Sequence, residues 1–106
     1  MTTKYTLYKI KSDRVDQWSY WCAQLSGPRH TEAAATLQDE GIVGEMFFIF
    51  FIQGVAYTLG CTILQDQTEK KSDQSVAINR EHQNQKLECL EFVSRGDAAC
   101  SLLALG

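Results

Sequence analysis

The stretch IVGEMFFIFFIQGVAYTLGCTIL, residues 42–64, is the part of the chain that says most about its architecture. It contains two runs rich in β-branched and aromatic residues, 42–52 and 55–64, separated only by Gln53 and Gly54. A two-residue connection between such runs is typical of a tight β-hairpin. One face of this hairpin is predicted to pair Ile52 with Val55, Phe50 with Tyr57, Phe48 with Leu59 and Met46 with Cys61. The opposite face is predicted to pair Phe51 with Ala56, Ile49 with Thr58, Phe47 with Gly60 and Glu45 with Thr62.

The residues before the hairpin predict a strand and a helix in two pieces. Residues 4–11 mix β-branched and aromatic side chains with lysines in partial alternation, which indicates a strand. Ser12 and Asp13 offer an N-cap for the helix that follows. The apolar stripe of this helix consists of Val15, Trp18, Cys22 and Leu25. Gly27–Pro28 interrupts the stripe, which then resumes until Gly41 ends it as a left-handed cap.

The residues after the hairpin predict a second main helix and a last strand. Residues 65–74 are polar and indicate a short helix or a loop. Asn79 is the predicted N-cap of a helix over 80–94. The apolar positions of this helix recur at three-residue steps and are Leu87, Leu90 and Val93. Gly96 follows the helix, and residues 98–105 read as a final buried strand.

The predicted order is strand, helix, hairpin, helix, strand. Right-handed crossovers place both helices on the same face of a four-stranded antiparallel sheet. The expected fold class is therefore α+β, of the ferredoxin-like βαββαβ type, with residues 1–106 forming a single domain.

This arrangement leaves one face of the sheet without cover from its own chain. Both sides of residues 46–52 are apolar, and only one side can touch the helices. Three or four large apolar side chains left in water would forfeit on the order of 5 to 10 kcal/mol, which is comparable with the whole stability of a domain, about 5 to 15 kcal/mol. We therefore expect a homodimer in which the sheet face meets a second copy of the chain.

Composition and charge exclude several classes of function. The 106 residues carry a net charge of −3, whereas proteins that bind nucleic acid normally present a basic surface. The four cysteines include no C-x-x-C pair, which argues against a zinc or redox motif. Residues 46–52 form the longest apolar run, far shorter than the roughly 20 residues of a membrane helix. With no signal peptide visible, the expected location is cytoplasmic.

Four residues are candidates for a functional site. Glu45 lies on a strand among apolar neighbours, so it is either a base or ligand anchor in a pocket between sheet and helices, or a solvated residue at the mouth of the strand. His82 falls in the first turn of the last helix if Asn79 is the cap, where it faces either a cavity or solvent. Trp18 and Tyr57 either line an apolar ligand pocket or belong to the core. No metal site and no cofactor is predicted.

Three short patterns carry a resemblance to a known group. Thr36, Leu37, Glu40 and Gly41 form a TL-x-x-EG pattern at a helix end, Glu45 stands early in the strand segment GEMFF, and a helix start runs from Asn79 through His82 to Cys89 and Leu90. In these features the chain resembles small bacterial proteins of the dimeric α/β-barrel type, and within them an uncharacterised family. Asn79 stands where that family has an aspartate, a change that keeps the cap and removes a charge. The resemblance implies ferredoxin-like chains whose sheets pack face to face, with no established activity.

Three functions fit this sequence. The first is the binding of a small apolar or aromatic molecule between sheet and helices. The second is a non-catalytic regulatory or assembly module in which the dimer is the working part. The third is an enzyme resembling the monooxygenases or isomerases of the dimeric-barrel group.

Overall fold

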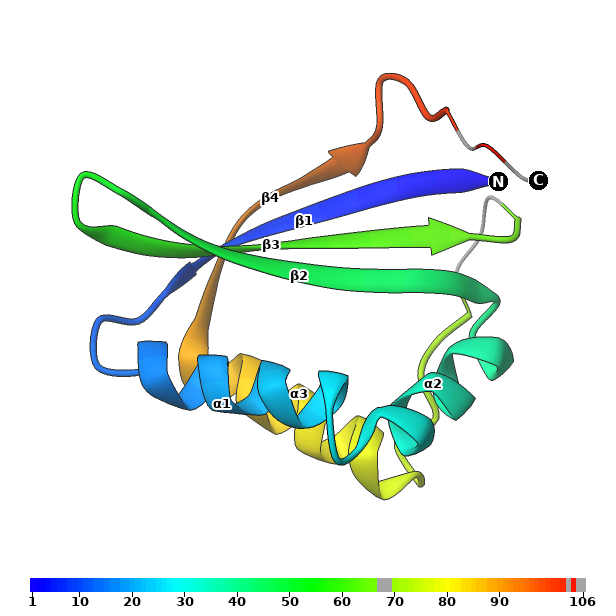
Figure 1. Cartoon of the computed structure of the whole chain (residues 1–106), viewed down its shortest axis with the longest axis horizontal. Coiled ribbons are helices and arrows are strands. Elements are labelled where there is room, and N and C mark those ends of the chain that lie inside the picture. Colours follow the sequence, from blue (N-terminus) through cyan, green and yellow to red (C-terminus); the bar gives the residue numbers. More distant parts are fainter. Residues whose placement is uncertain (67–69, 103, 105–106) are drawn as a thin grey trace.

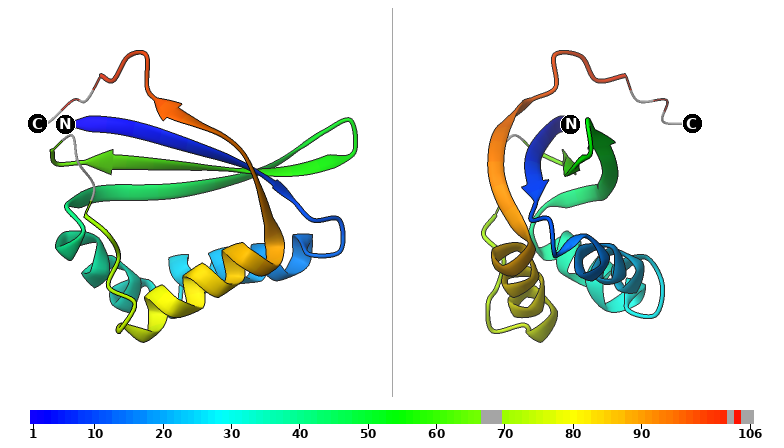
Figure 2. Two further views of the ribbon diagram at one scale, coloured as in Figure 1. Left: turned by 180° about the vertical axis from the view of Figure 1, so that it is seen from behind. Right: turned by 90° about the vertical axis from the view of Figure 1, so that its left-hand side faces the viewer.

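Four strands form one antiparallel sheet, and three helices cover one of its faces, in the computed structural model of residues 1–66, 70–102 and 104 (Figure 1). In chain order the elements are β1 (Thr2–Ile10), α1 (Val15–Ser26), α2 (His30–Asp39), β2 (Ile42–Ile52), β3 (Val55–Leu64), α3 (Ala77–Cys89) and β4 (Leu90–Asp97). The strand order across the sheet is β2-β3-β1-β4. The two views of Figure 2 keep the helices in a separate layer from the sheet. The predicted α+β class is confirmed. Over this described part of the chain, no helix has the length and apolarity that a membrane span needs.

The hairpin of β2 and β3 has the predicted bounds and the predicted register. All eight predicted pairs are present, from Ile52 opposite Val55 back to Glu45 opposite Thr62. Gln53 and Gly54 occupy the turn with positive φ angles of 50° and 78°. Left-handed angles at both central residues give the turn the twist that matches the flanking strands.

The first half of the chain follows the prediction except at one helix cap. β1 covers most of the predicted strand, and the helix breaks at Gly27–Pro28 into α1 and α2. Gly41 has the expected left-handed backbone, with φ of 73°. The predicted cap at Ser12 or Asp13 is wrong, because Arg14 precedes α1 and, among the described residues, no side chain caps it. A backbone bond closes this turn instead, from Arg14 N–H to the carbonyl of Lys11 over 2.9 Å.

The second half of the chain differs from the prediction at its last two elements. α3 begins at Ala77, so Asn79 lies inside its first turn, and the predicted cap at Asn79 is wrong. The helix ends at Cys89 and continues directly into β4, which pairs with β1. The predicted helix over 80–94 and strand over 98–105 are therefore also wrong in their bounds. Leu87 is 64% exposed and Val93 48% exposed, so they do not form the predicted buried stripe.

The structure also describes most of the two segments predicted as a short helix or loop, 65–74, and as a final strand, 98–105. The described residues of 65–74 contain no helix, and positions 67–69 lie outside the described residues. Residues 98–102 are exposed and outside any strand, on the side of the sheet away from the helices in both figures. Positions 103 and 105 of the predicted last strand lie outside the described residues.

The core lies between the helices and one face of the sheet, which we call the inner face. Its buried members are Ile10, Trp18, Trp21, Ala56, Ile78, Cys89 and Leu90. Alternate residues of β3 point to the inner face, and the Trp18 indole N–H donates to the Thr58 hydroxyl there over 3.1 Å. The opposite side is the outer face, where Phe48 is 50% and Ile52 55% exposed. Within one chain, the predicted uncovered apolar face is therefore present.

Candidate functional site

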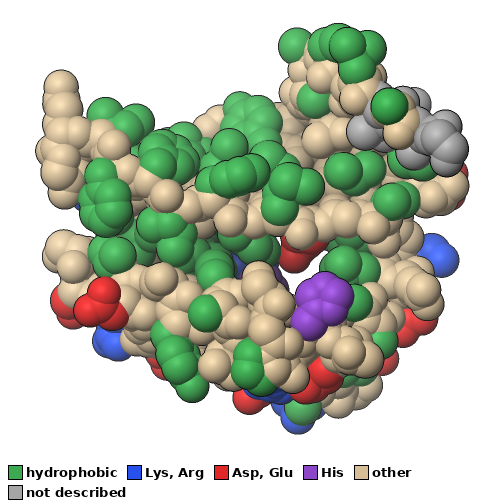
Figure 3. All heavy atoms as spheres, in the orientation of Figure 1, with side chains coloured by type: hydrophobic (Ala, Val, Ile, Leu, Met, Phe, Trp, Pro, Cys, Tyr) green, Lys and Arg blue, Asp and Glu red, His purple; other side chains and the backbone are tan. Residues whose placement is uncertain are grey.

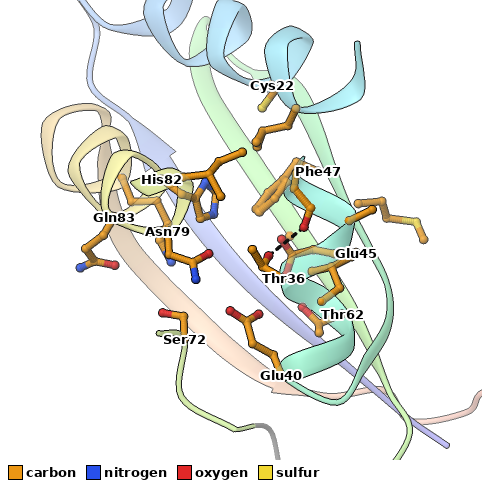
Figure 4. A pocket seen from close by; sticks show the side chains of 18 of the residues that line it. Cys22, Thr36, Glu40, Glu45, Phe47, Thr62, Ser72, Asn79, His82 and Gln83 are labelled. Carbon is orange, nitrogen blue, oxygen red and sulfur yellow. Dashed lines mark hydrogen bonds between the residues drawn. The ribbon is translucent and has the colours of Figure 1, made fainter. Parts of the chain in front are cut away.

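A cleft of about 760 Å³ opens between the inner face and the helices. Its walls come from β1, β2 and β3 on one side and from α1, α2 and α3 on the other, and segment 70–72 also contributes. Figure 3 shows the hollow between the sheet layer and the helix layer, and Figure 4 shows the side chains around it. The cleft therefore lies where every element except β4 contributes to its lining.

Phe47 provides an apolar surface inside the cleft. Its ring meets Trp18 edge to face, with ring centroids 5.6 Å apart and planes at 89°. Gly60 lies directly opposite Phe47 in the hairpin register. A Cβ atom at Gly60 would stand 2.8 Å from Cε1 of the Phe47 ring, too close for an ordinary contact. The glycine thus leaves the room that the ring needs to lie over β3.

His82 reaches the cleft from α3 and is held by aromatic neighbours. The Trp21 indole N–H donates to Nδ1 of His82 over 2.9 Å. The imidazole stacks on the Trp21 ring at a centroid distance of 6.1 Å and lies 5.7 Å from the Phe47 ring. Burial lowers the pKa of His82 to about 4, with the positive charge of Lys86 as the second cause. At neutral pH this histidine is therefore uncharged.

The predicted position of His82 in the first turn of its helix is wrong. Because α3 begins at Ala77 and not after Asn79, His82 lies in the second turn. It is mostly buried there rather than solvated. The sequence could not predict its partner, because Trp21 is 61 positions away in the chain.

Polar side chains from the sheet and from α2 also line the cleft. Burial raises the pKa of the Tyr8 hydroxyl, while Arg95 opposes this rise and Glu45 adds to it. Glu45 is exposed and lines the cleft. Its role as a base or ligand anchor stays a prediction. Glu40 is buried and lines the cleft as well. Glu40 was not predicted as a site residue from the sequence, although the TL-x-x-EG pattern contains it.

Thr36 illustrates how α2 turns polar groups toward this region. Its hydroxyl donates to the carbonyl of Ala33 over 2.7 Å, one turn earlier in the same helix (Figure 4). Such a bond satisfies the hydroxyl within the helix. The Thr36 side chain therefore lies at the cleft without needing a partner from the sheet.

The other two candidate residues lie away from the cleft space. Trp18 is completely buried and supports Phe47 from behind. Tyr57 points to the outer face and stacks on Phe50, with ring centroids 5.8 Å apart. Tyr57 and His82 of one chain are thus on opposite sides of the sheet. A direct contact of Trp18 or Tyr57 with a ligand stays a prediction.

Arg29 connects the corner between α1 and α2 to α3. Its guanidinium pairs with Glu32 over 2.8 Å and also with Glu81 of α3. The same group lies over the Trp21 ring, 5.5 Å from its centroid. These hydrogen bonds raise the pKa of Arg29 above its usual value. Arg29 was not predicted from the sequence, since Glu81 is 52 positions away.

By its structure the chain is a small α+β protein in which helices cover one face of an antiparallel sheet, with an open cleft between the two layers. Among the described residues, no group of histidine, cysteine and acidic side chains is arranged to hold a metal ion. The chain belongs to DUF6176, a family of unknown function, whose model matches residues 1–105. Comparison with curated proteins and with solved structures finds no match. The expectation of an uncharacterised family is confirmed to this extent.

Proposed function

We propose that this protein binds a small, partly aromatic molecule in the cleft and that it does so as a homodimer. The observation that carries the proposal is the cleft itself, in which the aromatic surface of Phe47 adjoins the polar groups of His82, Tyr8 and Glu45. Its volume of about 760 Å³ falls within the range of ligand pockets, roughly 300 to 1,000 Å³. Apolar walls with a few convergent polar groups are the usual construction of such pockets.

The position of these polar groups supports binding over a purely structural role. A core histidine is normally enclosed on all sides, whereas His82 is held by Trp21 on one side and lines the cleft on the other. Tyr8 is half-buried and also lines it. These groups come from α3 and β1, so the fold holds them in place before a ligand arrives. Such preorganisation favours affinity, because fewer side chains lose freedom on binding.

The outer face supports the homodimer. Four strands of about 10 residues, spaced about 4.8 Å apart, offer on the order of 600 Å², close to the roughly 800 Å² that each partner buries in a standard interface. A second copy is the occupant we propose, because each copy presents the same apolar surface and a two-fold arrangement covers both at once. Lys9 of β1 and Glu91 of β4 lie opposite each other in the sheet. The β1–β4 side of the sheet therefore carries charges of both signs.

The sheet order β2-β3-β1-β4, with helices on one face, supports a ferredoxin-like domain. Two such sheets packed face to face would form the dimeric α/β barrel expected from the resemblance. The cytoplasmic location stays a prediction from the sequence.

Thermal unfolding in the presence of candidate ligands tests the binding proposal. A specific ligand raises the melting temperature by mass action, so a panel of aromatic metabolites, haem and flavins should contain compounds that raise it. Ala34→Leu places a larger side chain into the cleft lining of α2. This variant should need at least a tenfold higher ligand concentration for the same rise in melting temperature. Ala35→Leu is the matched control, since Ala35 is exposed on the same helix and lies outside the lining. If no compound stabilises the protein while the dimer persists, the assembly-module function is favoured instead.

A further inference from the structure

We infer that His82 carries its proton on Nε2 and presents this N–H to the cleft as a fixed hydrogen-bond donor, so that the cleft takes a carboxylate attached to an aromatic or apolar body. The ligand class rests on the proposed function. The position of the proton does not, since it follows from the contacts of the chain alone.

The proton position follows from the Trp21 contact. An indole N–H can only donate, and a neutral imidazole has one nitrogen that donates and one that accepts. Trp21 donates to Nδ1 of His82 over 2.9 Å, so Nδ1 is the accepting nitrogen. The single proton of the neutral ring is then on Nε2. Burial beside Trp21 and Phe47 keeps the ring neutral at pH 7, because the charged form loses its hydration there.

The Nε2–H group faces the cleft. Among the residues that the structure describes, none accepts a hydrogen bond from it, and none of their buried side-chain nitrogen or oxygen atoms lacks a partner. An atom without a partner is therefore accessible, and His82 lines the cleft. Figure 4 shows the imidazole extending from α3 toward Phe47 across this space. A donor that is both accessible and fixed by its neighbour is suited to bind an acceptor oxygen.

Charge makes a carboxylate the fitting acceptor. Lys86 lines the cleft one turn after His82 on α3, and residues four apart on a helix share a face. Lys70 and Lys71 line it as well, so among the described residues of the lining three lysines stand against the two carboxylates of Glu40 and Glu45. These two glutamates belong to the end of α2 and to β2, across the cleft from α3. A ligand carboxylate therefore fits best beside His82 and Lys86.

The ligand body is expected to lie against Phe47. Cys22 and Leu25 of α1 and Ile78 of α3 add apolar lining around this ring. An aromatic ring next to Phe47 gains from ring contact as well as from loss of water. The fit is therefore an arylalkyl or aryl carboxylate rather than a sugar or a polar amino acid.

NMR spectroscopy of the full-length protein tests the proton position. Long-range ¹H–¹⁵N correlation at pH 7 should show Nε2 of His82 protonated and Nδ1 unprotonated, as one tautomer. Trp21→Phe removes the donor and keeps an aromatic ring, so this variant should show a mixture of tautomers. His30, exposed on α2, supplies the second histidine signal for comparison. A His82 proton on Nδ1 in the unaltered protein would overturn the inference, whatever the cleft binds.

Titration with phenylacetate and 2-phenylethanol tests the ligand class. The two probes share a ring and differ in the carboxylate, and phenylacetate should bind at least tenfold more tightly. Lys86→Met should reduce this preference without changing affinity for the alcohol, and Arg80→Met, on the same helix but outside the lining, should leave it unchanged. A cleft that prefers the alcohol overturns the carboxylate class but leaves the proposed function standing. A cleft that binds neither probe and no compound of the wider panel contradicts both.

Discussion

His82 and Trp21 form a contact whose consequences appear in the pH dependence of stability. Because burial lowers the pKa of His82 from 6.5 to about 4, the unfolded chain binds a proton between these pH values that the folded chain does not bind. The free energy of unfolding should therefore fall as the pH decreases through this window, by about 2 to 3 kcal/mol between pH 7 and pH 4.5. Urea unfolding at both pH values measures the change.

Two variants separate His82 from other titrating groups. His82→Gln should lose this part of the pH dependence, whereas His30→Gln, at an exposed position, should keep it. An unchanged pH dependence in His82→Gln would show that carboxylates alone cause the acid destabilisation.

Gly60 is a second single position with a measurable role. Gly60→Ala places a methyl group 2.8 Å from the Phe47 ring, which Trp18 and His82 hold in place. Such overpacking should destabilise the protein by about 1 to 3 kcal/mol in urea unfolding. Gly44→Ala is the control in the neighbouring strand, since its nearest atom, Cδ1 of Ile63, lies 3.9 Å away. Equal stability of the two variants would contradict the close approach of Phe47 to Gly60.

Between elements, Arg29 joins the α1–α2 corner to α3. Arg29→Met should lower stability slightly and make it less dependent on salt, because exposed ion pairs contribute little and are screened. The more specific readout is Trp21, whose ring would lose the guanidinium over its face and gain solvent. Its fluorescence should therefore move to longer wavelength. Arg80→Met is the control that should leave the Trp21 emission unchanged, because within the described ranges the Arg80 side chain bonds to the nearby backbone carbonyls of 74 and 75 and not to Trp21.

The hairpin and the α3–β4 junction show what sequence patterns can and cannot predict. The register of β2 and β3 was predictable from the turn back to Glu45 and Thr62, because a two-residue turn fixes the pairs that follow it until the register shifts between Ile42 and Gly44. The junction between α3 and β4 was not predictable, because no glycine or proline stands at Cys89 or Leu90 to mark the end of the helix. Leu87, Leu90 and Val93 also recur at a spacing that a helix would show, although only Leu90 is buried.

The candidate site was predictable only in part, for a related reason. Glu45 and His82 stood out because each is an unusual residue in its local segment, and both line the cleft. The contacts that define their setting join distant positions, as with Trp21 and His82 or Arg29 and Glu81. Local periodicity contains no information about such pairs, which depend on how α1 packs against α3.

For the whole molecule, the outer face provides the decisive prediction, which concerns the proposed homodimer. Sedimentation at low micromolar concentration should give twice the mass of one chain. Phe48→Glu introduces a charge on the outer face, in the edge strand β2, where desolvating it in an interface is costly, and should yield a folded monomer. Phe92→Glu is the matched control, because Phe92 is similarly exposed but contacts Tyr8 on the inner side of the sheet. A monomeric unaltered protein would contradict the homodimer.

Because α3 passes into β4 without a loop, the two elements form one continuous segment. His82 lies in the second turn of α3, near the start of this segment, and the other end of the segment is the edge strand β4. A ligand that displaces α3 would move β4 as well, and subunit contact and cleft occupancy would then influence each other equally in both directions. If the ligand and the second copy favour the same position of this segment, diluting the protein until the subunits separate would weaken ligand binding.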